Sequence, residues 1–380
     1  MACSVRPDLA DLEPYDPDMR PVRIMLSANE NNWGMPDDVA REAQRRLAGV
    51  ALNRYPEATS PRLRELLGQM WDVPAHRVVV ANGGDELLFN LLLAYGGKGR
   101  VLVNCPPTFS AYELYAKLTA TSVVNVNRDA NTFELDEDGL LEAARNPQAA
   151  LVVVTSPNNP TGNLASVDFV RRLAQATSSL VLVDEAYAEF CDVQASCVPL
   201  VSELPNVCVL RTMSKAYALA GARVGYLICP DDVADAMFAV RLPYSVNRMS
   251  QVVAETVVEM RGEFAPIIEA VREERSRLTE ALEGLAAELA ANLPDGADGL
   301  RVWPSEANFV MVRFPGQASG LSCADEMHEL LAADSILVRN FSRTPGLEGC
   351  LRISVGKPEE DDELLASLRR HLGLSERPIQ

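Results

Sequence analysis

Between about residues 78 and 230, short apolar runs alternate with longer stretches of helical character. The runs at Val78–Ala81, Leu151–Thr155, Leu180–Val183 and Val207–Leu210 are short and contain β-branched residues, which favours strands over helices. Strands that alternate with helical stretches are typical of a mostly parallel sheet with helices on its faces. The pattern therefore predicts an α/β fold whose large domain is built on such a sheet.

The remaining segments predict an arm before this domain and a smaller domain after it. Residues 1–35 are rich in proline and aspartate and are expected to form an N-terminal arm. A long helix is predicted over Ile267–Leu293, and strand-like and helical segments alternate again after it. We therefore expect a large domain over 36–275 and a small α/β domain over 276–380, against which the arm is a candidate to pack.

The segment Arg211–Arg223 places an amine, a hydroxyl and a cation close together, directly after a predicted strand. Lys215 follows Ser214, and Arg223 stands eight residues further on. This group suits pyridoxal phosphate (PLP), because a lysine forms a Schiff base with its aldehyde while serine and arginine hold its phosphate. Taken alone, an ordinary surface lysine is an equally good interpretation, since Ser-Lys is a common dipeptide.

Asp184 follows the predicted strand 180–183, at the end where open α/β sheets bind their ligands. A carboxylate at that place can keep a pyridine nitrogen protonated, because an ion pair in a site of low dielectric favours both charged forms. The alternative is that Asp184 caps a following helix. Together with Lys215, it favours a PLP site.

Two further turns follow predicted strands in the same way. In Ser156–Gly162, two prolines and a glycine shape a turn that aims Asn159 inward. Gly84 and Asp85 begin a predicted helix, and the N–H groups at a helix start can bind a phosphate. Each signal is weak alone, but four of them at successive strand ends jointly indicate one cofactor site.

With these motifs in place, the chain resembles the fold-type I PLP-dependent aminotransferases, and most closely the histidinol-phosphate aminotransferases. The segments that carry the resemblance are Leu12–Tyr15, Leu26–Asn31, Leu52–Pro56, Cys105–Phe109, Ser156–Gly162, Asp184–Tyr187, Ser214–Ala216 and Cys350–Gly356. The chain departs from the family's usual residues at Asn32, Ala81, Gly84 and Met213, where proline, glycine, serine or alanine, and leucine are usual. At Gly84, phosphate contact would rest on the backbone alone.

The resemblance implies a role for each matching residue. The implied catalytic residues are Lys215 as the Schiff-base lysine, Asp184 as the partner of the pyridine nitrogen, and Tyr187, which with Asn159 bonds the ring's phenolic oxygen. The other implied cofactor residues are Ser214, Arg223 and the backbone of Gly84 and Asp85 at the phosphate, Phe109 on the ring face, and Tyr55, which would reach the other subunit's phosphate in a homodimer. The implied substrate residues are Tyr15, Asn31, Arg339 and Arg352, the two arginines receiving an anionic group.

The implied reaction is transamination between histidinol phosphate and the glutamate/2-oxoglutarate pair, as in histidine biosynthesis. Three alternatives remain open from the sequence. The enzyme could act on aromatic or other amino acids, or it could be a lyase similar to threonine-phosphate decarboxylase. A PLP-binding transcription regulator would need a basic DNA-binding segment ahead of the domain, and residues 1–35 are too short and too acidic for one.

Composition excludes several other classes of partner. The net charge is 35 − 53 = −18, which argues against binding to nucleic acids or anionic membranes. No apolar run is long enough to span a membrane, and the first residues lack a signal-peptide pattern. Eight scattered cysteines and three distant histidines predict free thiols and no metal site. We therefore expect a cytoplasmic enzyme.

Overall fold

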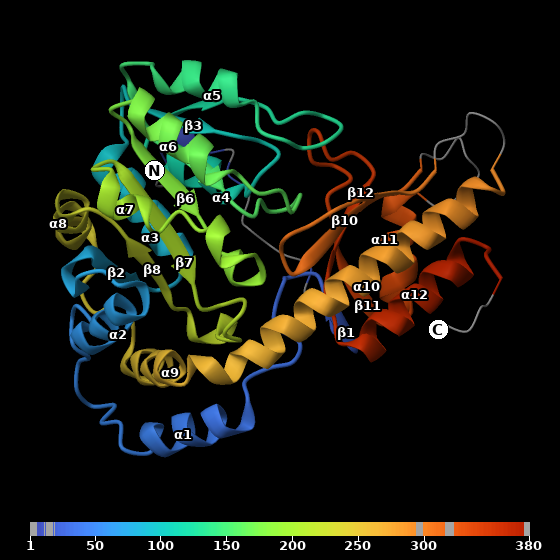
Figure 1. Ribbon diagram of the computed structural model, residues 1–380, viewed down its shortest axis with the longest axis horizontal. Helices are drawn as coiled ribbons and strands as arrows, with labels where there is room; N and C mark the ends of the chain where they lie inside the picture. The colour runs from blue at the N-terminus through green and yellow to red at the C-terminus, as the bar shows by residue number, and fades with distance from the viewer. Residues whose placement is uncertain are drawn as a thin grey trace, which may run out of the picture.

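A computed structural model describes residues 6–10, 12, 18, 20–293, 299–315 and 323–375 of the chain. Figure 1 shows a large lobe and a small lobe, with the long helix α10 running from one to the other. Each lobe contains a sheet flanked by helices, so the α/β fold class is confirmed. The division into an arm and two domains at residues 35 and 275 stays a prediction. Within the described residues, no helix is both long and apolar enough to cross a bilayer.

The elements have the following bounds. The helices are α1 (Asp37–Leu47), α2 (Pro61–Trp71), α3 (Gly84–Tyr95), α4 (Ala111–Leu118), α5 (Glu137–Ala144), α6 (Val167–Ala176), α7 (Leu200–Glu203), α8 (Asp231–Val240), α9 (Arg248–Glu259), α10 (Ala265–Ala290), α11 (Ala324–Ala333) and α12 (Pro358–His371). The strands are β1 (Ile24–Leu26), β2 (Val78–Ala81), β3 (Val101–Asn104), β4 (Ser122–Asn125), β5 (Ala149–Thr155), β6 (Leu180–Asp184), β7 (Val207–Thr212), β8 (Gly225–Ile228), β9 (Arg301–Trp303), β10 (Phe309–Arg313), β11 (Ile336–Asn340) and β12 (Cys350–Ser354).

The large sheet has seven strands in the order β2-β8-β7-β6-β5-β3-β4. Neighbouring strands are parallel throughout, except that β8 runs antiparallel to both β2 and β7. The carboxyl ends of β2, β3, β5, β6 and β7 therefore lie at one edge of the sheet. That edge is where a doubly wound sheet places its ligand.

Alternate residues of the buried strands face two different helix layers. Val181 and Val183 of β6 belong to a core shared with α2, α5 and α6, whereas Leu180 and Leu182 pack into a second core with α3, α4 and α8. Because both faces are covered, these strands are apolar at almost every position. This explains why they appear in the sequence as continuous apolar runs.

The small lobe is built on a five-stranded sheet in the order β1-β11-β12-β10-β9. The first two strands after α10, β9 and β10, pair antiparallel. β1 comes from the segment before the large domain and pairs parallel with β11, with Ile24 opposite Ile336. A segment that precedes the large lobe in the sequence therefore completes one edge of the small-lobe sheet.

Candidate active site

A cavity of about 400 Å³ opens where the strand ends of the large sheet face the small lobe. This volume is within the range of roughly 300–1,000 Å³ that is usual for small-molecule sites. Eleven of the residues singled out from the sequence line this one cavity. They are Gly84, Asp85, Phe109, Asn159, Asp184, Tyr187, Ser214, Lys215, Arg223, Arg339 and Arg352.

Lys215 follows β7 and extends its amine into this cavity. Its Nζ donates a hydrogen bond to the carbonyl oxygen of Ala28 at 2.9 Å and lies 5.8 Å from the centre of the Tyr187 ring. Burial lowers the pKa of Lys215 to about 8, and the positive charge of Arg352 contributes to this shift. A substantial neutral fraction at mildly basic pH makes this amine a nucleophile and a base.

Asp184 is the last residue of β6, and both of its carboxylate oxygens are held. Oδ2 accepts a hydrogen bond from the hydroxyl of Tyr112 at 2.7 Å, and Oδ1 accepts one from the backbone N–H of Ala186 at 3.1 Å. Burial raises the pKa of Asp184 to about 6, while these two hydrogen bonds oppose the rise. The carboxylate is therefore ionised at neutral pH and held in one orientation.

An anion-binding cradle lies at the start of α3. Gly83 adopts a left-handed backbone with φ of 88°, and a Cβ added there would lie 2.7 Å from Nη2 of Arg223. Arg223 also pairs with Asp85 at 3.1 Å, and Ser214 lines the same cavity. The glycine leaves room for backbone N–H groups, a hydroxyl and a guanidinium to meet one anion.

Arg352 on β12 brings the small lobe into the site. It is only 6% exposed, and its Nη1 donates to Oδ1 of Asn159 at 2.5 Å while its Nη2 donates to the carbonyl oxygen of Ser27 at 2.6 Å. Asn159 in turn donates from Nδ2 to the hydroxyl oxygen of Tyr187 at 3.3 Å. Hydrogen bonds thus link Arg352, Asn159 and Tyr187 in a row along the cavity wall.

Arg339 stands opposite Arg352 on the neighbouring strand β11. In the part of the chain that the structure describes, its guanidinium has no hydrogen-bond or ion-pair partner, and it lies 5.9 Å over the ring of Phe341. Two guanidinium groups on adjacent strands therefore face the same cavity. Such planar, multiply donating groups suit carboxylates and phosphates.

Two described residues that were singled out from the sequence, Asn31 and Tyr55, do not line the cavity. Asn31 lies outside it, because its Nδ2 donates to the carbonyl oxygen of Ala216 at 3.0 Å and its Oδ1 accepts from the backbone of Trp33. Tyr55 is 83% exposed and stacks on Tyr244, away from this chain's own cavity. Tyr15 lies outside the described residues.

The structure also adds lining residues that the sequence did not single out. Asn29 stands where Asn31 was expected, and Tyr112 and Thr155 form the floor beneath Asp184. Asn29 lies two residues before Asn31, in the segment Leu26–Asn31 that carries the family resemblance. The resemblance therefore pointed to the right segment but to the wrong asparagine. No pattern marks Tyr112, because an aromatic residue on a helix is more often part of a core than of a site.

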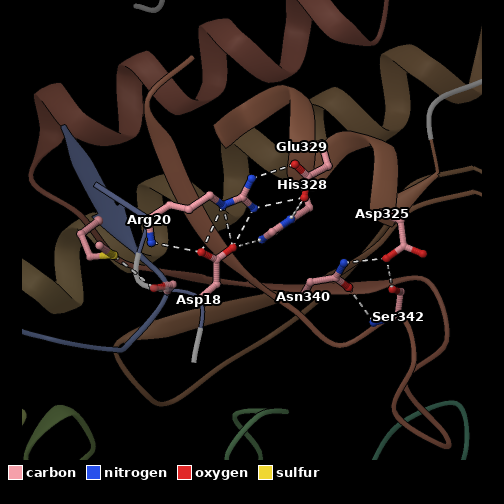
Figure 2. Close-up of polar contacts among 9 residues, drawn as sticks. Asp18, Arg20, Asp325, His328, Glu329, Asn340 and Ser342 are labelled. Atoms are coloured by element: carbon pink, nitrogen blue, oxygen red, sulfur yellow. Dashed lines mark hydrogen bonds and ion pairs between the residues drawn. The ribbon is translucent and has the colours of Figure 1, made fainter. Parts of the chain in front are cut away.

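The arm contributes Asp18 to the outer wall of the cavity. Figure 2 shows Arg20 lying between Asp18 and Glu329 of α11, with the ring of His328 beside them. Arg20 donates to Oδ2 of Asp18 at 2.6 Å and to Oε2 of Glu329 at 2.7 Å, and His328 Nδ1 lies 3.2 Å from Oε1 of Glu329. These contacts tie the arm to α11.

A second set of contacts ties the loop after β11 to the same helix. Oδ1 of Asp325 accepts hydrogen bonds from Nδ2 of Asn340 and from the hydroxyl of Ser342, both at 2.7 Å (Figure 2). Asn340 lines the cavity beside Arg339. α11 therefore contacts two segments that contribute to the cavity wall, through Asp18 and Asn340.

A sheet of this topology, a lysine and an aspartate at neighbouring strand ends, and a second lobe that supplies arginines are the arrangement of an aminotransferase. The chain belongs to the family described as aminotransferase class I and II, whose profile matches residues 22–368. Because that match spans most of the chain, it includes both lobes and every lining residue from Ser27 to Arg352.

The curated relatives point to one subfamily. The chain is 35% identical over 349 residues to the histidinol-phosphate aminotransferase of Chlorobium luteolum, with 92% of each chain covered. It is 34% identical to the enzyme of that name from Thermococcus kodakarensis, with 95% of this chain and 97% of the other covered. It is 37% identical to the histidinol-phosphate aminotransferase of Roseiflexus castenholzii, with 96% of this chain and 97% of the other covered.

Solved structures share the fold. A histidinol-phosphate aminotransferase from Sinorhizobium meliloti, in complex with pyridoxal-5'-phosphate, superposes with a TM-score of 0.85 at 24% identity and covers 98% of both chains. The L-threonine-O-3-phosphate decarboxylase from Porphyromonas gingivalis superposes with a TM-score of 0.78 at 21% identity, covering 92% of this chain and 99% of that one. The fold therefore does not by itself choose the reaction.

Proposed function

We propose that the protein binds PLP and transfers an amino group between histidinol phosphate and 2-oxoglutarate, with glutamate as the other amino compound. The observation that carries the proposal is one cavity with two separate cationic ends. Arg223 stands at the helix start in the large lobe, and Arg339 and Arg352 stand on the small lobe. The names of relatives that match over nearly the whole chain support the choice of histidinol phosphate.

The residues of the cavity fit PLP. Its phosphate would lie in the cradle of Gly84, Ser214 and Arg223, where an added Cβ on Gly83 would collide with the arginine. Asp184 would hold the ring nitrogen, and Lys215 would bind the aldehyde carbon. When bound, PLP supplies an electron-withdrawing ring that acidifies the Cα–H bond of the amino substrate.

The protein's own part in the reaction is to move one proton and to hold charge. Nζ of Lys215 would take the Cα proton of the amino substrate and return it at the neighbouring carbon, since its lowered pKa suits both directions. Asp184 stays ionised at neutral pH, so it would keep a positive charge on the ring nitrogen beside it. Arg339 and Arg352 would orient the substrate through its anionic group.

Removing the hydroxyl of Tyr112 tests how Asp184 is held. In Tyr112→Phe, the carboxylate loses a 2.7 Å donor, so the pKa of Asp184 should rise further above its usual range. We expect PLP to bind about tenfold more weakly at pH 7, as the loss of a buried hydrogen bond to a charge implies. Fluorescence titration of the cofactor-free protein measures this. Tyr115→Phe, on the same helix but outside the cavity lining, is the control, and equal affinities in both variants would contradict the assignment.

Arg339→Gln tests recognition of the anion. We expect the KM for histidinol phosphate to rise about ten- to a hundredfold while kcat changes little, because a charge-assisted contact to the unreacting end of the substrate is lost. Steady-state kinetics with 2-oxoglutarate as acceptor measures both constants. Arg343→Gln, on the exposed loop nearby, is the matched control, and an unchanged KM for the Arg339 variant would remove this residue from the site.

A spectral titration tests the function as a whole. Histidinol phosphate added to the PLP-loaded protein, with no acceptor present, should bleach the visible absorbance of the bound cofactor. Addition of 2-oxoglutarate should restore it with one glutamate formed per site. Bleaching by phenylalanine but not by histidinol phosphate would identify an aromatic aminotransferase. Release of carbon dioxide without any acceptor would identify a decarboxylase.

We also propose a homodimer in a reducing, cytoplasmic compartment. Tyr55 and Tyr244, which stack on each other, are exposed large apolar side chains, as are Leu52, Leu242 and Met249. A second copy would cover them and would receive Tyr55 at its own phosphate cradle. All seven cysteines in the described residues are free thiols, as is usual in reducing compartments. Sedimentation of a monomer at micromolar concentration would overturn the dimer.

A further inference from the structure

Asn29 joins the arm to the small lobe inside the cavity wall. It is 1% exposed and has a left-handed backbone with φ of 53°. Its backbone N–H donates to Oγ of Ser354 at 2.9 Å, and the Ser354 hydroxyl donates to its Oδ1 at 2.9 Å. Its carbonyl oxygen accepts from Nδ2 of Asn308 at 3.1 Å. The backbone N–H and Oδ1 of Asn29 are thus bonded to strand β12, and its carbonyl oxygen is bonded to the turn before β10.

The fourth polar group of Asn29 points at Tyr187. Nδ2 of Asn29 donates to the hydroxyl oxygen of Tyr187 at 3.1 Å, and Nδ2 of Asn159 donates to the same oxygen at 3.3 Å. Neither amide can be turned round without loss, because Oδ1 of Asn29 serves Ser354 and Oδ1 of Asn159 serves Arg352. Both amides therefore present N–H groups to the phenol.

Two N–H donors decide how the phenol can act. A tyrosine hydroxyl has one proton to donate and two lone pairs that accept. With both lone pairs engaged by Asn29 and Asn159, the proton of Tyr187 has to point in the remaining direction as a donor. Without Asn29, a lone pair would be released, and the hydroxyl could rotate to accept a hydrogen bond instead.

The two donors also connect Tyr187 to a single strand. Arg352 and Ser354 stand two residues apart on β12 and so face the same side of the sheet. Arg352 reaches Tyr187 through Asn159, and Ser354 reaches it through Asn29. The resulting ring of hydrogen bonds fixes the phenol relative to the strand that carries the substrate-facing arginine.

We propose that Asn29 is a positioning residue that keeps the Tyr187 hydroxyl acting as a hydrogen-bond donor to an oxygen of the bound cofactor. The proposal rests on the proposed function for the identity of that acceptor. The hydrogen-bond ring itself is a property of the protein without cofactor.

The variant Asn29→Asp tests the direction of the hydroxyl proton. Aspartate tolerates the left-handed backbone and has nearly the same size, so the fold should be kept. Its carboxylate has no N–H and would accept the proton of Tyr187. We expect kcat/KM to fall about tenfold, as for the loss of one buried hydrogen bond. Tyr187→Phe should give the same loss, and the double variant should be no worse than either.

Two measurements separate this role from a merely structural one. In the PLP-loaded protein, the pH at which the visible absorbance changes should shift equally in Asn29→Asp and Tyr187→Phe. In the cofactor-free protein, a double-mutant cycle on unfolding midpoints with Asn29→Gly, which keeps the positive φ, should show that Asn29 and Tyr187 are coupled. Asn32→Ala is the matched control, since its amide bonds Glu360 at 2.8 Å outside the cavity.

Additive effects of the Asn29 and Tyr187 substitutions on kcat/KM, or an unshifted absorbance titration in Asn29→Asp, would overturn the proposal. A wild-type protein that takes up no PLP would instead refute the proposed function. In that case the double-mutant cycle on unfolding midpoints still decides whether Asn29 and Tyr187 are coupled. An absence of coupling would refute the proposed ring of hydrogen bonds.

Discussion

Lys215→Ala is expected to abolish transamination. Among the residues that the structure describes, Lys215 is the only lysine that lines the cavity, so no other lysine there can bind the aldehyde carbon or carry the Cα proton. The loss of a nucleophile that is also the proton carrier should lower kcat by at least about 10⁴-fold. Turnover of histidinol phosphate with 2-oxoglutarate measures the loss. Lys215→Arg should be equally inactive, because a guanidinium keeps the charge but serves neither as a nucleophile nor as a base.

The same lysine predicts a pH dependence for cofactor uptake. Only the neutral amine attacks an aldehyde, and burial together with Arg352 lowers the pKa of Lys215 to about 8. The rate at which the cofactor-free protein takes up PLP should therefore rise with pH up to about 8 and level off above it. Stopped-flow absorbance follows this reaction. A profile that keeps rising toward the ordinary lysine value of 10.5 would contradict the lowered pKa.

Asp184→Asn is expected to lower the activity of the enzyme while it raises the stability of the cofactor-free protein. An amide cannot hold a positive charge on the ring nitrogen, so kcat should fall about 10²- to 10³-fold, as when a group that stabilises developing charge is removed. The kcat of the PLP-loaded variant, measured with saturating substrates, checks this. Lys117→Ala, on the surface of α4, should retain full activity as a control for the mutagenesis.

The stability of the cofactor-free Asp184→Asn protein should change in the opposite direction. Burial raises the pKa of Asp184 from 3.8 to about 6, so between these values the folded protein binds more protons than the unfolded chain. The free energy of unfolding therefore falls as pH rises through this window, by on the order of 3 kcal/mol, and the cost is fully present above pH 6. The neutral amide avoids that cost. Thermal unfolding at pH 8 should show a higher midpoint for the variant, and a lower midpoint would contradict the assigned cause.

Much of the fold could be predicted because its strands are buried on both faces. Continuous apolar runs such as Leu180–Val183 mark such strands, and a polar residue directly after each run marks the edge where ligands bind. This is why Lys215, Asp184 and Asn159 could be assigned to one site from the sequence. The family resemblance, by contrast, implied Asn31 as a substrate residue, whereas the structure has Asn29 in the cavity. Asn29 has a left-handed backbone, a local conformation that the sequence pattern does not encode.

Other parts of the site depend on packing that leaves no periodic signal. Tyr112 of α4 bonds Thr155 of β5 and Asp184 of β6, and Asp18 lines the cavity while its neighbour Arg20 bonds Glu329 of α11. Side chains that act through tertiary contacts between distant segments cannot be recognised from spacing along one chain. Arg339 and Arg352 were both expected to receive an anionic group, and the pairing of β11 with β12 places them side by side.

The pairing of β1 with β11 has a consequence for the order in which the protein is made. Residues 24–26 leave the ribosome more than 300 positions before their partners at 336–338. The small sheet thus lacks one edge until nearly the whole polypeptide has been synthesised, whereas residues 78–228 can assemble the central sheet of the large lobe earlier. The nascent chain must therefore carry an unpaired β1 through most of translation, and completion of the small lobe is a late event in biogenesis.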